Sequence, residues 1–450
     1  MTKFLRPDKM IAAALCFFAS ITTVGAAAAP TVPLQVTQPP NVILIVTDDQ
    51  RDGLRVMPAT RQRFIAEGTN FPNAFVTTPL CCPARASIMT GRYVHNHGVL
   101  SNGDDDWRNF DEADSIQSKL DGAGYRTALF GKLLNHWPQS RVPAHFDTWA
   151  LLPDVAGRTG YYGATWNLDG TLRKVGTYST NFLEAKATSF IESSEENDSE
   201  PFYMYIATAA AHRSFVPEPK YEGASVPRWR GNPAVFEKDR SDKPAYVRNA
   251  SFSYKEGKAR RAAQFRTLMS VDDMVDAIVD TLDAAGEQDT LVLFVSDSGY
   301  LWGEHGLTNK QVPYEESIRM PMMLRWPGHA TGADSRLVTN VDIAPTIYAA
   351  AGISAETDGR DLLDESWTRD RIHLEYFGDP NAPSIPRWAS TWTPQGQYVE
   401  YYGAGAAVTF REYYELATDP WQLRNVRRPP DASWEVRLEA DRRCSGATCP

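Results

Sequence analysis

Short, uninterrupted apolar runs recur along this chain, and each of them ends at polar residues or at glycine. The first run covers residues 41–46 and leads into Thr47, Asp48, Asp49 and Gln50; similar runs cover residues 126–130, 202–207 and 291–295. Apolar runs without polar alternation are typical of parallel strands that are covered on both faces. We therefore predict buried parallel strands whose carboxyl ends open onto a crevice.

A second pattern, apolar residues at helical spacing, fills the stretch between the last two runs. The predicted helix ends at Gly286, and its apolar positions are Leu268, Val271, Val275, Ile278 and Leu282. Spacings of three and four residues place these side chains on one helical face. Strands that alternate with helices indicate an α/β layered fold with a mostly parallel sheet.

The pattern changes near residue 370, where short Tyr- and Trp-rich segments are separated by Gly and Pro turns. These segments predict a smaller C-terminal α+β subdomain with a small antiparallel sheet. A chain of 450 residues can hold one large domain and one smaller one. We expect a main domain at 41–365, which carries the chemistry, and a subdomain at 366–450.

The N-terminus has the pattern of an export signal. Lys3, Arg6 and Lys9 precede an apolar run that extends to Val24, and small residues follow up to Ala29. A basic start, an apolar middle and a small-residue end predict a signal peptide at 1–29, followed by a Pro-rich linker at 30–40. A retained membrane anchor is the alternative. The expected location is secreted, or periplasmic, with no membrane attachment after processing.

The charge balance limits the partners of the processed chain. Removal of residues 1–29 takes three cations and Asp8 and changes the formal net charge from −10 to −12. Bulk attraction to nucleic acid or to heparin-like polymers is not expected of an acidic protein, so an anionic substrate needs a local basic pocket. One locally basic stretch consists of Lys255, Lys258, Arg260, Arg261 and Arg266. We interpret it first as a solvated helix start and second as a polymer contact.

Four cysteines remain after processing. Cys444 and Cys449 lie five residues apart and predict a small terminal disulfide loop in an oxidising compartment. Cys81 and Cys82 are adjacent, and adjacent cysteines rarely bridge each other because the geometry is strained. At least one of them therefore has another role.

Cys81 opens the segment Cys-Cys-Pro-Ala-Arg-Ala-Ser-Ile-Met-Thr-Gly-Arg. Pro83 suits a first helical turn and Gly91 suits the end of the helix. Cys81 would then lie at a helix N-terminus, where unpaired N–H groups and the helix dipole favour an anion. Arg85, one turn along, could reach back to the same place. A helix N-terminus combined with an arginine predicts a cradle for sulfate or phosphate.

Three carboxylates follow apolar runs and are expected at one edge of the sheet. Asp48 and Asp49 follow the first run, and Asp297 follows the last. Each of them taken alone suits a turn or a helix cap. Gathered together they would repel one another unless a cation held them. Oxygen ligands select Ca²⁺ or Mg²⁺ rather than zinc.

These features resemble the sulfatase family over roughly residues 41–426. The segment at Cys81 is similar to its signature C-x-P-x-R followed by T-G-R, in which the first cysteine is oxidised to formylglycine (3-oxoalanine). The similarity continues at Gly131-Lys132, at His212 with Pro217, at Ser296-Asp297-Ser298-Gly299 and at Lys310. The run Gly-Lys-Leu-Leu-Asn after residue 130 and the terminal cysteine loop resemble the N-acetylglucosamine-6-sulfatase branch, with arylsulfatase-like members as further relatives. The resemblance implies an alkaline-phosphatase-like three-layer sandwich.

The resemblance also implies roles for individual residues. The hydrated aldehyde of residue 81 is the nucleophile, and the ligands of the divalent cation, expected to be Ca²⁺ with Mg²⁺ as the alternative, are Asp48, Asp49, Cys81, Asp297 and Ser298. Arg85, Lys132 and Lys310 offset charge on the sulfate oxygens, and Lys310 or His212 protonates the leaving alcohol. The implied partners are a sulfate ester, of a sugar or an aryl group, and the maturation enzyme that generates formylglycine. No nucleic acid partner is implied.

The chain departs from the family pattern at two places. Ser298 stands where the family usually has Asn or another stronger ligand, so we expect a weaker or altered metal site. Leu134 stands where many members carry a histidine, and His136 could substitute for it. Tyr300 and Trp302, next to the metal segment, are expected to form pocket walls.

Two other functions fit the same motifs. A phosphodiesterase or phosphonate monoester hydrolase of the same superfamily can share C-x-P-x-R. A non-catalytic protein that binds sulfated glycans is the alternative of a different class, and Ser298 is the sequence feature that favours it.

Overall fold

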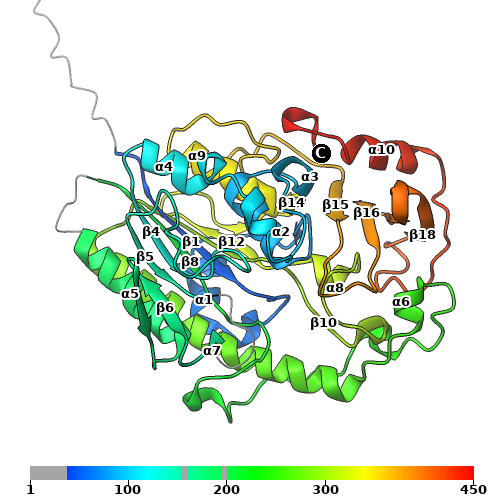
Figure 1. Cartoon of the computed structure of the whole chain (residues 1–450), viewed down its shortest axis with the longest axis horizontal. Helices are drawn as coiled ribbons and strands as arrows, with labels where there is room; N and C mark the ends of the chain where they lie inside the picture. The colour runs from blue at the N-terminus through cyan, green and yellow to red at the C-terminus, as the bar shows by residue number, and fades with distance from the viewer. Residues whose placement is uncertain (1–37, 154–159, 195–199) are drawn as a thin grey trace, which may run out of the picture. The chain divides into compact units, whose positions relative to one another are not determined.

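A ten-stranded mixed sheet forms the centre of the computed structural model, which describes residues 38–153, 160–194 and 200–450 (Figure 1). Its strands lie in the order β13-β2-β12-β9-β1-β8-β4-β5-β6-β7. Their bounds in that order are Gly332–Ala333, Thr69–Asn70, Met322–Arg325, Thr290–Ser296, Asn41–Thr47, Phe202–Ala207, Arg126–Gly131, Thr148–Leu151, Thr165–Leu168 and Thr171–Lys174. The predicted signal peptide and the linker up to residue 37 lie outside the described residues.

The middle of this sheet is parallel, as the apolar runs predict. β1 pairs in parallel with β8 on one side and with β9 on the other, and β4 and β5 continue the parallel set. Antiparallel pairs lie outside it, where β12 joins β9 and where β5, β6 and β7 pair in succession. The four predicted runs are β1, β4, β8 and β9, and nearly all of their side chains are buried.

Helices cover both faces of the sheet and give a three-layer sandwich. α5 (Ser179–Ser194) and α7 (Tyr254–Ala285) lie on one face, while α2 (Cys81–Thr90), α4 (Ile116–Gly122) and α9 (Ile343–Ala350) lie on the other (Figure 1). Successive side chains of a strand point to opposite faces. Val42 and Leu44 of β1 therefore pack under α2, α4 and α9, while Ile43 and Ile45 pack under α5 and α7.

The predicted long helix is α7, and it extends further toward the N-terminus than its apolar pattern. The side chains of Ser253 and Glu256 form a capping box at its start, which satisfies backbone N–H groups that have no partner in the helix. Gly286 ends α7 with a left-handed φ of 85°, a conformation that costs glycine little.

A four-stranded antiparallel sheet follows the main sheet along the chain, as predicted. Its strands are β15 (Ile372–Tyr376), β16 (Arg387–Trp392), β17 (Gln397–Tyr402) and β18 (Val408–Tyr414), and α10 (Ser433–Asp441) packs against one face. Its opposite face packs on residues of the main domain, which include Phe75 and Tyr314. Residues 39–450 form one compact unit, so a division at 365/366 stays a prediction.

Five short strands and helices complete the connections that later paragraphs use. They are α3 (Val94–His97), α6 (Ala245–Arg248), α8 (Glu315–Ile318), β10 (Leu301–Trp302) and β11 (Thr308–Asn309). No helix within residues 38–153, 160–194 and 200–450 is long and apolar enough to cross a membrane.

The C-terminal segment is held beside α3 by hydrogen bonds and contains a disulfide. Cys444 and Cys449 form the predicted disulfide. The His95 ring on α3 donates to the Glu375 carboxylate (2.9 Å) and, from its other nitrogen, to the Cys444 carbonyl (2.9 Å). Since both partners are acceptors, the two hydrogen bonds require a protonated ring. Burial alone would lower the pKa of His95, but these two acceptors raise it above its ordinary value.

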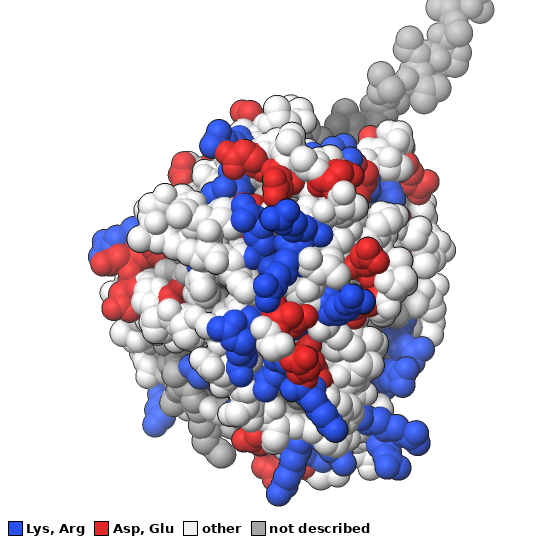
Figure 2. All heavy atoms as spheres, turned by 90° about the vertical axis from the view of Figure 1, so that its right-hand side faces the viewer, with Lys and Arg blue, Asp and Glu red and all other residues white. Residues whose placement is uncertain are grey.

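The charged side chains are distributed unevenly over the surface. Figure 2 shows the face that holds α6, β18 and α10, where Lys and Arg gather in the middle and along the lower edge, and Asp and Glu lie along the upper edge and among the basic side chains in the middle. The acidic net charge of the chain is therefore not spread over every face.

Candidate active site

The carboxyl ends of β1 and β9 bring the three predicted carboxylates together. Thr47 at the end of β1 is in register with Ser296 at the end of β9, so Asp48 and Asp49 lie beside Asp297. Consecutive side chains of a regular strand would point to opposite faces. Asp49 instead adopts a left-handed φ of 65°, which breaks this alternation and lets both carboxylates face one place.

Cys81 begins α2 and faces these carboxylates. Leu80 before it is extended, and Gly91 after the helix is left-handed with φ of 69°, as the motif predicts. The thiol is 1% exposed, and its Sγ lies 3.6 Å from Asp48 Oδ1. One ligand atom from each of Asp48, Asp49, Cys81 and Asp297 falls within 4.8 Å of all the others. This cluster could hold a metal ion.

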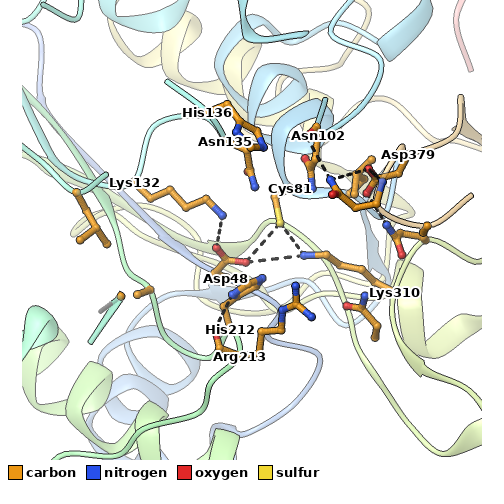
Figure 3. A pocket seen from close by; sticks show the side chains of 18 of the residues that line it. Asp48, Cys81, Asn102, Lys132, Asn135, His136, His212, Arg213, Lys310 and Asp379 are labelled. Atoms are coloured by element: carbon orange, nitrogen blue, oxygen red, sulfur yellow. Dashed lines mark hydrogen bonds and ion pairs between the residues drawn. The ribbon is translucent and has the colours of Figure 1, made fainter. Parts of the chain in front are cut away.

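Three buried cations surround the same cluster. Arg85 donates from Nε to Asp297 Oδ2 (2.8 Å), and its Nη2 lies 3.3 Å from Asp48 Oδ2. Lys132 donates to Asp48 Oδ2 (2.7 Å). Figure 3 shows Lys132 and Lys310 approaching Asp48 and Cys81 from opposite sides.

Lys310 contacts Cys81, the predicted nucleophile, directly. Its ammonium donates to Cys81 Sγ (2.7 Å) and to Asp49 Oδ1. Three cations therefore balance three carboxylates around one thiol. The predicted catalytic residues Arg85, Lys132 and Lys310 thus lie with the predicted ligands in one site.

The electrostatics of the site keep the carboxylate charged and the thiol neutral. Burial alone would raise the pKa of Asp48, but Lys132 and the other neighbouring cations hold it well below its usual range. Burial raises the pKa of the Cys81 thiol, and the Asp48 charge adds to this effect. The thiolate, not the thiol, is the reactive form of cysteine. The unmodified side chain is therefore a poor nucleophile here.

His212 lies at the mouth of the site after β8. Its Nδ1 donates to the Arg213 carbonyl (2.8 Å), and its Nε2 faces Asp49 Oδ2 at 3.8 Å. The side chain is 27% exposed, so it can contact both the cluster and a molecule in the pocket. The backbone bond fixes the ring so that Nε2 is the nitrogen available for proton exchange.

Ser298, predicted to weaken or alter the metal site, lies inside the cluster. Its hydroxyl donates to Asp49 Oδ1 (2.9 Å) and lies 3.4 Å from Asp297 Oδ1. The side chain is fully buried. The structure thus brings Ser298 to the ligand oxygens, and its coordination of a metal stays a prediction.

The cluster opens into a polar pocket of about 380 Å³. Figure 3 shows Asn102, Asn135, His136 and Asp379 around its wall. His136 lines the pocket, whereas Leu134 is buried away from solvent, so a substitution of His136 for the family histidine stays a prediction. Tyr300 and Trp302 do not line this pocket, so the prediction that they form its walls was wrong. They are buried because their rings pack toward α7 in the core under the sheet.

Several pocket residues gave no signal in the sequence. Asp379 and Asn381 follow β15 in the C-terminal part of the chain, and Asp379 accepts a hydrogen bond from Gln311 (2.7 Å). Asn102 accepts from the backbone N–H of Cys82 (2.9 Å) and so supports the start of α2. An isolated Asn or Asp in a loop is most often a turn residue, so its position in the pocket depends on tertiary contacts.

The layered fold and its strand-end site are those of a hydrolase of anionic esters. The family model described as Sulfatase matches residues 40–353, and that described as N-sulphoglucosamine sulphohydrolase, C-terminal, matches residues 303–441. The chain belongs to the sulfatase family and is a sulfuric ester hydrolase.

Named relatives share most of the length of the chain. Human N-acetylglucosamine-6-sulfatase is 30% identical over 483 residues, which cover 92% of this chain and 86% of that protein. The N-acetylglucosamine-6-O-sulfatase of Bacteroides thetaiotaomicron is 25% identical, over 87% of this chain and 83% of that protein.

Solved structures share the architecture. A protein in complex with its substrate D-glucosamine-2-N,6-O-disulfate has a TM-score of 0.75 and 22% identity, covering 89% of this chain and 96% of that one. The phosphonate monoester hydrolase of Agrobacterium radiobacter has a TM-score of 0.65 and 23% identity, and the match covers 89% of this chain and 94% of that one. At these identities the likeness establishes the fold alone, and it confirms the predicted alkaline-phosphatase-like class.

Proposed function

We propose that this protein hydrolyses sulfate esters of sugars, with residue 81 in its formylglycine form as the nucleophile and a divalent cation in the strand-end cluster. The observation that carries this proposal is the position of Cys81. It lies at a helix N-terminus, within 4.8 Å of three carboxylates and in contact with the Lys310 ammonium. A neutral buried thiol has little reactivity there, so a modified side chain accounts better for the surrounding charges.

The hydrated aldehyde would supply one hydroxyl to attack sulfur, and its second hydroxyl would allow sulfate to leave as the aldehyde forms again. The cation would supply Lewis-acid activation of the nucleophile and of a sulfate oxygen. Oxygen ligands from Asp48, Asp49 and Asp297, with the Ser298 hydroxyl, suit Ca²⁺, with Mg²⁺ as the alternative.

The donor set fits an anion bound beside a cation. Arg85 Nη2 is buried and forms an ion pair with Asp48 Oδ2 (3.3 Å) but no hydrogen bond among the described residues, which leaves its N–H groups for a sulfate oxygen. Three carboxylates and three cations give the site no net formal charge. A divalent cation would add two positive charges, and the sulfate group of the ester, a monoanion, would offset one of them.

The chain's own residues would stabilise and protonate the reacting groups. Arg85 and Lys132 would donate to sulfate oxygens, because both already direct N–H groups into the carboxylate cluster. His212 Nε2 and the Lys310 ammonium border the pocket and are the candidates that protonate the leaving alcohol. We infer that one of these two groups acts as the general acid.

The proposed substrate is a sugar sulfate, and 6-sulfated N-acetylglucosamine is the first compound to test. Two relatives with broad coverage carry names for that activity. The pocket wall offers amide and carboxylate groups, which suit sugar hydroxyls, on Asn102, Asn135, Asp379 and Asn381. We further propose export through the signal peptide and maturation of Cys81 by a formylglycine-generating enzyme.

The deciding experiment combines mass spectrometry with kinetics. A tryptic peptide that contains residue 81 should have the mass of the aldehyde rather than the thiol in protein from the native host. The same preparation should hydrolyse 6-sulfated N-acetylglucosamine, and chelation followed by Ca²⁺ should remove and restore this activity. Unmodified thiol in an active preparation contradicts the nucleophile, and a higher rate on an aryl phosphodiester would favour the phosphodiesterase alternative.

A further inference from the structure

A strongly basic segment lies outside the active site. Residues 228–258 contain eight Lys or Arg and four Asp or Glu, a formal charge of +4 in a chain whose net charge is −10. Arg228, Arg230, Lys255 and Lys258 are exposed, and none of them forms an ion pair with an acid in the part of the chain that the structure describes. Cations without acidic partners repel one another, so such a group is not explained by stability.

Aromatic rings lie among these cations. Trp229 stands between Arg228 and Arg230, and its ring centroid is 5.4 Å from that of Tyr254, which precedes Lys255. The Phe236 ring centroid is 5.3 Å from that of Tyr254. Phe236 is 54% exposed, more than any other described Phe or Trp. Trp229 and Tyr254 are partly buried, and Trp229 also packs against the core, so Phe236 is the ring that this group exposes most. An exposed ring beside unpaired cations is typical of a binding surface.

Other cations of α7, the helix that carries Lys255 and Lys258, form hydrogen bonds within the protein instead. Arg260 donates to the Tyr300 hydroxyl (3.2 Å), Arg261 to the Pro227 carbonyl (2.9 Å), and Arg266 to the Ala224 carbonyl (3.0 Å). Arg261 and Arg266 thereby fix the segment that carries Arg228 and Trp229 to α7. The segment is therefore positioned by the fold, which places its unpaired cations next to the start of α7.

We propose that this surface is a docking platform for a sulfated polysaccharide chain. The basic–aromatic platform consists of Arg228, Trp229, Arg230, Phe236, Tyr254, Lys255 and Lys258. Guanidinium groups form paired hydrogen bonds with sulfate oxygens, and aromatic faces stack on sugar rings. This proposal rests on the proposed function, and it adds a site that holds the polymer while one sulfate ester occupies the pocket.

The position of the platform relative to the active site is limited by Trp302, a buried residue on which the Trp229 ring packs. The Trp229 ring centroid lies 5.7 Å from that of Trp302, which follows Asp297 by five residues. Five residues span at most roughly 18 Å. Arg213, at the pocket rim, leads along the chain into the same segment. These chain lengths limit the separation of the platform from Asp297, and in our proposal a polymer of several sugar units follows the surface between them.

The test is affinity for heparin as the probe, measured against ionic strength on the intact, mature protein. The double variant Arg228→Gln/Arg230→Gln should raise the Kd at least tenfold. It should also lower the slope of log Kd against log salt by roughly 1 to 2, because fewer counterions are released. Phe236→Ser, a change at an exposed ring, should weaken binding by roughly tenfold. Hydrolysis of 6-sulfated N-acetylglucosamine should stay within twofold of wild type in every variant.

The matched control is Arg173→Gln/Lys174→Gln on β7, which removes two exposed cations elsewhere. It should leave heparin affinity unchanged. An unchanged Kd in the platform variant, or an equal loss in the control, overturns the proposal. Equal affinity for single-stranded DNA at the same salt would overturn the assignment to a glycan. Binding needs no turnover, so a failure of the proposed function would appear only in the hydrolysis assay.

Discussion

Arg85→Met should destabilise the protein more than any change of an exposed arginine. The Arg85 side chain is fully buried, bonds Asp297 and the Lys132 carbonyl, and lies 3.3 Å from Asp48. Methionine keeps much of the volume but leaves two buried carboxylates without this cation. Removal of one partner of a buried ion pair costs about 3–5 kcal/mol.

This loss of stability corresponds to a measurable fall in Tm. A compact unit of roughly 410 residues (39–450) has an unfolding entropy near 0.9 kcal/mol/K, so this loss lowers Tm by about 3–6 °C. The assay is thermal unfolding in EDTA, followed by calcium addition. Calcium should raise the Tm of the variant part of the way back, since it binds the freed carboxylates in the folded state. Turnover should fall by about 100-fold or more.

Arg63→Met is the matched control. Arg63 pairs with Asp276 (3.0 Å) at the surface with 21% of its side chain exposed, and such pairs contribute about 0–1 kcal/mol. Its Tm should fall by no more than about 1 °C. A Tm for Arg85→Met within 1 °C of wild type in EDTA would refute the claim that Arg85 neutralises the buried carboxylates.

Three further predictions concern other parts of the molecule. Cys81→Ser should abolish sustained turnover, whereas Cys82→Ser should retain it. Steady-state rates on a sugar sulfate measure this difference, and multiple turnovers by Cys81→Ser would contradict the mechanism. The raised pKa of His95 means that its stabilising contribution is complete below about pH 6.5 and is lost as the pH rises through the raised value. Tm scans should show this fall in wild type and not in His95→Gln, and an identical pH profile would disprove it. Gly257→Ala should lower stability by more than about 2 kcal/mol, because a Cβ there would lie 1.5 Å from the Trp302 carbonyl oxygen, while Gly122→Ala, with open space, should stabilise by up to about 1 kcal/mol. Denaturant unfolding separates the last two, and equal midpoints would count against the packing argument.

Much of the fold could be predicted from local patterns alone. The apolar runs correspond to β1, β4, β8 and β9 because a strand buried on both faces cannot alternate with polar residues. The helix spacing predicted α7, and the segment at Cys81 predicted the start and end of α2. These signals depend on neighbours within a few residues, so the sequence alone is enough to predict them.

Other features were decided by contacts between distant segments. Tyr300 and Trp302 follow Asp297 closely, yet they pack into the core, because the chain turns back toward α7 after the metal segment. Asp379 and Asn381 reach the pocket only because the C-terminal sheet packs against the main domain. No local pattern distinguishes such residues from ordinary turn residues.

The sequence by itself determined the α/β class, the order of strands and helices, and the residues with the chemistry of an anion and cation site. Only the tertiary structure decided how closely these residues approach one another and which further residues share their site. It placed three carboxylates, three cations and one thiol within contact distance, and it grouped unpaired arginines with three aromatic rings, of which Phe236 is exposed. The physical reason is that charge interactions depend on distance in space, whereas the sequence orders residues only along the chain.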